Sequence, residues 1–190
     1  RLSAVLLLTL RGTPFLYQGE ELGLRDGAIP EEQRVDVAGR DPARCPLPWE
    51  PPSVAGPGAG FTAGRPWLPI APDAETRAVA RQLDDPQSVL SLYRTLLALR
   101  RREPALRVGS MAVFEGTGPV LVYRREVPTA SLLVLLNFDG QPATVRAADV
   151  GRPAIRGTIE ASSTMDDLGR GVDAPEVELG PFEGLVLREA

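Results

Sequence analysis

Four charged side chains in the first quarter of the chain stand close enough in sequence to act together. Arg40 and Arg44 lie four residues apart in a proline-rich segment, and Glu20 and Glu21 are adjacent. A guanidinium offers several fixed N–H donors and pairs bidentately with a carboxylate. Two neighbouring carboxylates suggest acid and base catalysis. These residues are therefore the first candidates for binding and for catalysis.

The composition excludes several other kinds of chemistry. All 21 basic residues are Arg, there is no His, and Cys45 is the single cysteine, which excludes an internal disulfide and any multi-cysteine metal site. We interpret Cys45 as a small buried side chain. The net charge of −4, with no basic block, argues against nucleic acid as a partner. We expect no metal and no cofactor.

No apolar run approaches the roughly 20 residues of a membrane span, so we expect no membrane partner. We expect a cytoplasmic location, but the chain opens on Arg1 in mid-helix rather than on Met, which leaves an upstream signal peptide open. With 43% hydrophobic and 24% charged residues, the chain should form a packed core.

The candidate residues follow a predicted helix and strand. Residues 2–10 are apolar nearly all round, which predicts a helix packed on a sheet, with Arg11 and Gly12 as its C-terminal charge and left-handed stop. Pro14 suits the first residue of a strand, and residues 15–17 form a short apolar run before Gly19. This pattern predicts a buried parallel strand.

A long segment without periodicity, residues 24–85, separates this strand from a second helix. Its prolines interrupt regular structure, while Trp49 and Trp67 favour an ordered loop in which both rings are covered. Asp84, Asp85 and Pro86 indicate a helix start, and apolar spacing continues to Leu99. We interpret Arg100, Arg101 and Arg102 as a solvated helix end, stopped by Pro104.

Beyond Pro104 the pattern changes to short alternating runs, separated by turn residues such as Gly116, Gly118 and Gly140. The runs are Met111–Phe114, Val120–Arg125, Ser131–Phe138, Ala143–Ala147, Ala154–Glu160, Glu176–Leu179 and Gly184–Arg188. Their spacing predicts an antiparallel sandwich of about seven strands.

Four stretches, in order, resemble glycoside hydrolase family 13, the α-amylase superfamily, in its α-glucosidase and oligo-1,6-glucosidase branch. They are Gly12-Thr-Pro14 with Tyr17-Gln-Gly-Glu-Glu-Leu-Gly23, Arg40-Asp-Pro-Ala-Arg-Cys-Pro-Leu-Pro-Trp49, Pro66-Trp-Leu-Pro69, and the helix from Asp85 to Arg100 with its exit at Glu103-Pro-Ala-Leu106. The second departs from the family pattern, with Cys45 in place of Thr and Leu47 in place of Met.

The resemblance implies an α/β plus all-β chain in two parts. Residues 1–103 would be the C-terminal part of a TIM (β/α)8 barrel, with helix seven, strand eight, a long loop and helix eight. Residues 104–190 would be a β-sandwich domain. A complete barrel takes roughly 250 residues, so the chain would be a C-terminal fragment of a longer enzyme.

The same resemblance assigns roles to the candidates. Arg44 matches the family arginine that helps recognise the non-reducing-end glucose, and Arg40 would line the same pocket or brace the loop. The family's catalytic acids lie on other strands, so Glu20 and Glu21 are interpreted as structural, and this chain would contain no catalytic carboxylate. Alone it should be inactive, with residues 1–103 self-associating or poorly ordered because the missing N-terminal barrel portion leaves apolar faces uncovered.

The implied function is the C-terminal portion of a retaining α-glucosidase acting on short oligosaccharides. One alternative is a glucosyl-transferring relative, similar to trehalose synthase or sucrose isomerase. A non-catalytic carbohydrate-binding or structural β domain is another, as is a transporter heavy chain of the same superfamily. A binding domain would need exposed aromatics, whereas Phe114, Tyr123, Phe138 and Phe182 mostly alternate into the core.

Overall fold

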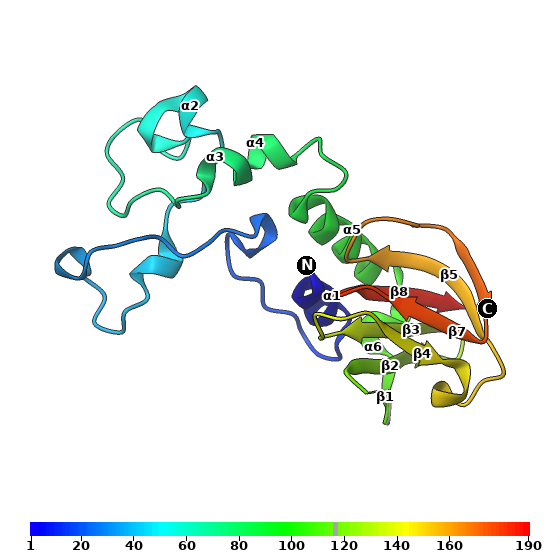
Figure 1. The fold of residues 1–190 in the computed structure, drawn as a ribbon. Coiled ribbons are helices and arrows are strands. Elements are labelled where there is room, and N and C mark those ends of the chain that lie inside the picture. The colour runs from blue at the N-terminus through cyan, green and yellow to red at the C-terminus, as the bar shows by residue number, and fades with distance from the viewer. Residues whose placement is uncertain (116–117) are drawn as a thin grey trace. The chain divides into compact units, whose positions relative to one another are not determined.

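The structure is a computed structural model that describes residues 1–115 and 118–190, so the predicted turn residue Gly116 lies outside the described residues. The chain divides into two compact units, residues 1–14 with 92–190 and residues 15–91, and each is described by itself (Figure 1). These units are defined by packing. The domain boundary at 103/104 therefore stays a prediction.

Three α-helices of the described residues lie in or enter the first unit, namely α1 (Leu2–Thr9), α5 (Val89–Arg102) and α6 (Pro104–Val108). The predicted helix at residues 2–10 is thus confirmed. The side chain of Ser88 accepts a hydrogen bond from the Ser91 N–H at 3.0 Å, which makes Ser88 the cap of α5 rather than Asp84 or Asp85. Pro104 follows the end of α5 and begins α6, because proline fits the first turn of a helix.

The strands of this unit form two antiparallel sheets. They are β1 (Ser110–Phe114), β2 (Val120–Val127), β3 (Ala130–Asn137), β4 (Ala143–Arg146), β5 (Ile155–Ser162), β6 (Gly171–Ala174), β7 (Glu176–Leu179) and β8 (Gly184–Glu189). Six strands form one sheet in the order β1-β2-β3-β8-β5-β6, and β4 pairs with β7 in the other. A 3-10 helix, η5 (Ala147–Val150), follows β4.

The antiparallel expectation is confirmed, and the seven predicted runs each overlap a strand. β6 was missed. It is a short edge strand that contains a Gly and an Asp and a single β-branched residue, so its sequence carries little strand signal.

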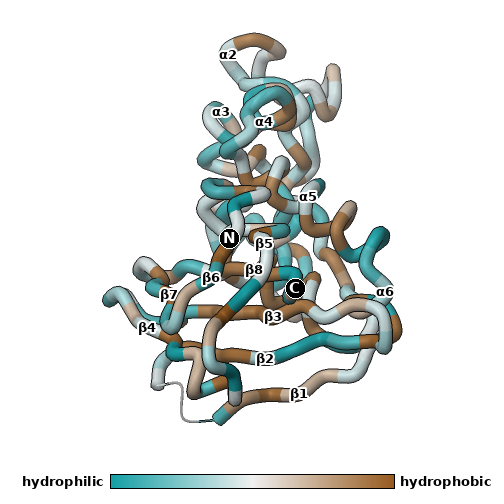
Figure 2. The backbone as a smooth tube through the Cα atoms, turned by 90° about the vertical axis from the view of Figure 1, so that its right-hand side faces the viewer, coloured by the Kyte–Doolittle hydropathy of each residue, from teal (hydrophilic) through white to brown (hydrophobic). Residues whose placement is uncertain are grey.

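The two sheets share one hydrophobic core. Leu133 and Leu135 of β3, Val145 of β4 and Leu179 of β7 are among the side chains that pack in it. The other face of the larger sheet meets α1 and α6. β3 is therefore buried on both faces, and Figure 2 shows it hydrophobic along most of its length, whereas β2 turns hydrophilic towards its end.

Two aromatic side chains do not follow the expected alternation into this core. Tyr123 is fully buried and Phe114 packs partly against the core, but Phe138 and Phe182 are exposed at 46% and 58%. Phe138 directly follows β3 and Phe182 lies in the turn before β8, so the two-residue alternation of a strand does not apply to either.

Two arginines close the C-terminal end of α1. Arg100 donates to the carbonyls of Leu8 (2.8 Å), Leu10 (3.1 Å) and Gly12, and Arg125 donates to the carbonyl of Thr9 at 2.6 Å. The predicted glycine stop is wrong, because the residue that ends the helix, Leu10, is extended. The predicted solvated position of Arg100 is wrong as well, since its side chain is buried against these carbonyls.

The second unit consists of short helices joined by irregular backbone. They are η1 (Glu20–Leu22), η2 (Glu31–Gln33), η3 (Asp41–Arg44), α2 (Pro52–Ala55), η4 (Gly56–Gly58), α3 (Ala74–Arg77) and α4 (Val79–Gln82). Residues 13–17 run without helix or strand, so the predicted strand is not formed there: nothing in the described residues pairs with it. Phe15 is 85% exposed.

The expectation that both tryptophan rings are covered is wrong for this unit. Trp49 is 53% exposed and Trp67 is 77% exposed. The loop is held instead by backbone hydrogen bonds, such as those from the N–H groups of Trp49 (2.9 Å) and Glu50 (3.0 Å) to the carbonyl of Ala59.

Across residues 1–115 and 118–190, no helix has both the length and the apolar composition that crossing a bilayer requires.

Candidate functional site

The two candidate arginines lie at the ends of a tight turn. Pro42 sits in the first turn of η3, where its missing N–H leaves no donor unpaired. Arg40 directly precedes this short helix, and Arg44 is its last residue. The buried Asp41 holds the turn, because its Oδ2 accepts the N–H groups of Val35 (2.7 Å) and Asp36 (3.0 Å). The carboxylate thereby ties η3 to the backbone of residues 35 and 36.

Asp36 gathers both arginines onto one carboxylate. Arg40 binds it bidentately, with Nε 2.9 Å from Oδ2 and Nη2 2.6 Å from Oδ1, and the Arg40 N–H donates to Oδ2 at 2.8 Å. Arg44 reaches the same carboxylate as an ion pair, with its Nη1 3.7 Å from Oδ1, which exceeds hydrogen-bonding distance.

The environment of the Asp36 carboxyl favours its ionised form. Hydrogen bonds from the side chain and then the backbone of Arg40, followed by the nearby charge of Arg44, hold the pKa of the Asp36 carboxyl well below its usual range. Hydrogen bonding to Asp36 raises the pKa of the Arg40 guanidinium. Asp36 and Arg40 therefore carry opposite charges at neutral pH.

The two arginines differ in what they offer to a ligand. The fork of Arg40 is occupied by Asp36, whereas within the described residues the Arg44 side chain makes an ion pair and no hydrogen bond. Arg44 remains 41% exposed. Among the described residues, Arg44 therefore keeps N–H donors that make no hydrogen bond, whereas Arg40 is held by Asp36.

Glu20 and Glu21 belong to η1, in the turn that follows residues 13–17. The Glu21 carboxylate accepts the Gly19 N–H at 2.8 Å, and Gly19 has a left-handed φ of 95° that favours glycine. The Glu21 carboxylate therefore braces this turn, and the expectation that neither Glu20 nor Glu21 is catalytic stays a prediction.

A small pocket of about 140 Å³ lies beside η3. It is lined by residues 17–20, 24–26, 42, 43, 45 and 71. Cys45 is buried at its wall, as expected, and burial raises the pKa of its thiol, which makes the thiolate scarce. A larger hollow of about 840 Å³ lies in the sheet unit and contains neither candidate arginine.

Sequence reasoning missed the two aspartates that organise the site. Asp36 precedes Arg40 by four residues, a spacing that suits an ion pair, and this was the available signal. Asp41 carried no such signal, because its partners are backbone N–H groups. In residues 1–115 and 118–190, no three His, Cys, Asp or Glu side chains gather in a way suited to a metal ion.

The comparison with known proteins identifies the class. Residues 1–109, more than half of the chain, match the family described as "Alpha amylase, catalytic domain". The chain therefore belongs to the α-amylase family, glycoside hydrolase family 13, and its relatives place it in the α-glucosidase and oligo-1,6-glucosidase branch.

Three relatives illustrate the similarity. A probable α-glucosidase of Rhizobium meliloti (strain 1021) is 39% identical over 153 residues, covering 76% of this chain and 27% of the relative. An oligo-1,6-glucosidase of Parageobacillus thermoglucosidasius is 29% identical, covering 99% and 37%. The solved trehalulose synthase MutB from Pseudomonas mesoacidophila MX-45 is 27% identical with a TM-score of 0.85, covering 98% and 37%.

The chain thus spans between 27% and 37% of the length of these relatives. Its antiparallel sheet unit fits the β-rich C-terminal part of a family 13 enzyme. The assignment of residues 1–103 to barrel helices seven and eight and strand eight stays a prediction.

Proposed function

We propose that the chain is the C-terminal portion of a retaining α-glucosidase that acts on α-glucosidic bonds of short oligosaccharides. The observation that carries the proposal is the cluster of Asp36, Arg40 and Arg44, in a chain that belongs to family 13. A guanidinium with available donors suits the hydroxyl groups of a sugar.

In this proposal each member of the cluster has one task. Arg44 donates hydrogen bonds to the glucose unit at the non-reducing end, since its side chain is exposed and otherwise makes only an ion pair. Asp36 holds the Arg44 side chain in place by charge attraction. Arg40 locks Asp36 through the bidentate contact, so it supports the site and need not touch the sugar.

Bond cleavage is assigned to carboxylates outside this chain. Retaining hydrolysis uses a nucleophile and an acid about 5–5.5 Å apart across the scissile bond. Glu21 is engaged with the Gly19 N–H, Asp36 is paired with Arg40, and the buried Asp41 accepts the N–H groups of Val35 and Asp36. The chain alone is therefore proposed to be inactive and to depend on the remainder of a barrel.

Glucosyl transfer is the second candidate, and the similarity to a trehalulose synthase favours it. A solved structure of MutB holds "the substrate sucrose", so sucrose is the discriminating probe. The assay uses the chain after it has been extended upstream through its native reading frame. Conversion of sucrose to an isomeric disaccharide supports glucosyl transfer as the function. Release of glucose and fructose supports hydrolysis.

The exposed apolar side chains bear on the proposed partners of the chain. Phe15 and Trp67 are 85% and 77% exposed, which supports either coverage by the rest of a barrel or self-association of residues 1–103. An oligosaccharide is the proposed substrate partner. A cytoplasmic location is part of the proposal.

The test is Arg44→Met in the chain extended upstream through its native reading frame, assayed on maltose and isomaltose. Loss of charged hydrogen bonds to the sugar should lower kcat/KM roughly 10- to 100-fold. Arg65→Met is the matched control, since Arg65 is an exposed arginine of the same loop, and it should leave kcat/KM unchanged. An Arg44→Met enzyme with unchanged kcat/KM would exclude Arg44 from the binding site.

A further inference from the structure

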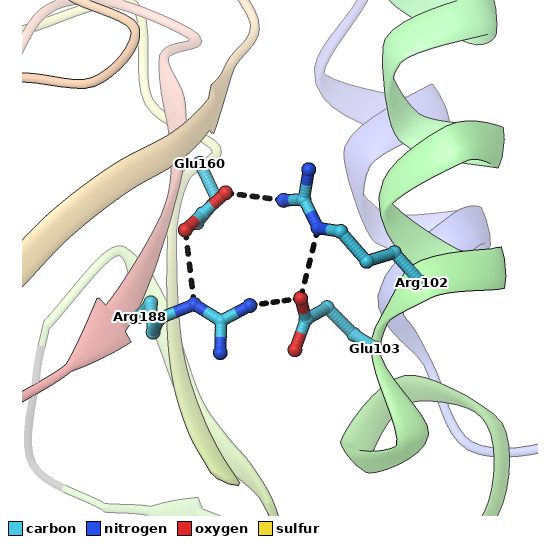
Figure 3. Close-up of polar contacts among 4 residues, drawn as sticks. All are labelled: Arg102, Glu103, Glu160 and Arg188. Carbon is cyan, nitrogen blue, oxygen red and sulfur yellow. Dashed lines mark hydrogen bonds and ion pairs between the residues drawn. The ribbon is translucent and has the colours of Figure 1, made fainter.

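Four charged side chains close a ring where α5 ends. Figure 3 shows Arg102 and Glu103, at the end of α5, facing Glu160 of β5 and Arg188 of β8. Arg102 Nε lies 3.0 Å from Glu103, and Arg188 Nε lies 3.0 Å from Glu160. Arg102 also pairs with Glu160, and Arg188 with Glu103, so each charge has an opposite charge on both sides.

The burial of these side chains is unequal. Glu103 is 2% exposed and Glu160 is 18% exposed, while Arg188 and Arg102 are 38% and 58% exposed. A carboxylate as buried as Glu103 is costly to ionise unless cations replace its lost hydration. Two guanidiniums supply the positive charge at once, that of Arg102 from the last residue of α5 and that of Arg188 from the sheet.

The ring joins parts of the chain that are distant in sequence. Arg102 and Glu160 are 58 residues apart, and Glu103 and Arg188 are 85 apart. It also lies at the predicted boundary between barrel and sandwich. An alternating ring of this kind permits one arrangement of the helix end on the sheet. Any shift would bring like charges together or leave the buried Glu103 carboxylate without a cation.

We propose that Arg102, Glu103, Glu160 and Arg188 form an ionic latch that fixes the C-terminal end of α5 on β5 and β8. The latch works as one unit. Its function depends on the complete alternation of charge rather than on any single pair, and it is independent of the proposed glucosidase activity.

The test is amide hydrogen exchange of the 190-residue chain, followed at residues 99–106 and, as an internal reference, at residues 120–123 of β2. Arg188→Met leaves the buried Glu103 with one partner. We expect exchange at residues 99–106 to become at least tenfold faster, with the reference unchanged. Arg156→Met is the matched control, since Arg156 forms an exposed, isolated pair with Asp173, and it should change neither segment.

Charge reversal separates a cooperative ring from independent pairs. Reversing one pair, Glu160→Arg with Arg188→Glu, keeps that pair but sets like charges against Arg102 and Glu103, and should accelerate exchange at least tenfold. Adding Arg102→Glu and Glu103→Arg restores alternation and should return exchange to within about threefold of the original. Unchanged exchange in the pair reversal overturns the proposal, as does equal acceleration in both segments.

A salt titration of the unaltered chain keeps the proposal testable where variants fail to fold. The Debye length falls from about 10 Å at 0.1 M to about 3 Å at 1 M, so the exposed guanidiniums lose part of their attraction. Exchange at residues 99–106 should rise severalfold relative to residues 120–123. A constant ratio of the two rates overturns the latch.

Discussion

At the scale of single residues, the hydroxyl of Tyr123 links β2 to α1. The Thr9 hydroxyl donates to the Val5 carbonyl at 2.5 Å, so Tyr123 donates to Thr9, also at 2.5 Å. Burial raises the pKa of Tyr123 to about 12, although the hydrogen bond to Thr9 and the charge of Arg125 oppose this. The phenol is neutral in the folded chain where an unfolded chain would begin to ionise it.

This shift predicts a loss of stability at high pH. Because the folded pKa lies above the unfolded value of about 10, the contribution is complete below pH 10 and is lost as the pH rises towards 12. Urea denaturation at pH 9, 10, 11 and 12 should show the midpoint falling in this window. Tyr123→Phe should flatten the fall, and equal slopes for both chains would contradict the assignment.

At this scale the sequence pointed to some of the charged residues and not to others. Arg40 and Arg44 were chosen from their motif, and their role in binding stays a prediction. Asp36 was within reach through its spacing from Arg40. The roles of Arg100 and Arg125 were not predicted, since the carbonyls of Leu10 and Thr9 that they bind lie 90 and 116 residues away in sequence. Local patterns carry no information about such distant partners.

At the scale of elements, Arg125 connects β2, α1, α6 and β1. Its side chain is fully buried and donates to the carbonyls of Thr9 (2.6 Å), Ser110 (3.1 Å), Leu106 (3.2 Å) and Gly109 (3.2 Å). Burial, reinforced by the charge of Arg100, lowers the pKa of this guanidinium. The carbonyls at the end of a helix are otherwise unpaired, so Arg125 replaces a conventional cap.

Arg125→Met should therefore destabilise the chain by about 3 kcal/mol, because it leaves several buried carbonyls without donors. Arg125→Lys should recover only part of this, since one ammonium cannot match the planar fork. The measurement is the free energy of unfolding in urea. Arg107→Met, on the exposed side of α6, is the control, and equal values for Arg107→Met and Arg125→Met would refute the capping role.

Secondary structure was predicted best where each element is stabilised within its own unit. α1 and the strands that build the shared core followed from periodicity, because burial on one or both faces leaves a repeating signal. Residues 13–17 carry a strand pattern but form none, since a strand needs a hydrogen-bonded neighbour that the described residues do not provide. The prediction missed β6 for the opposite reason. Residues 171–174 form a strand because they pair with β5, although their sequence does not suggest one.

At the scale of the whole molecule, the chain combines a well-packed sheet unit with a loop-rich unit that exposes large aromatic side chains. The cluster of Asp36, Arg40 and Arg44, which we propose binds the substrate, belongs to the loop-rich unit, whereas the proposed latch and the buried arginines belong to the sheet unit. We infer that stability and substrate recognition are served by different parts of the sequence, and that cleavage requires residues beyond this chain.

The most direct test of this account is hydrolysis of p-nitrophenyl α-glucoside by the 190-residue chain, beside the same chain extended upstream through its native reading frame. The account predicts p-nitrophenol release by the extended chain and none by the short one. Release by the short chain would contradict the central claim and would direct attention back to Glu20 and Glu21.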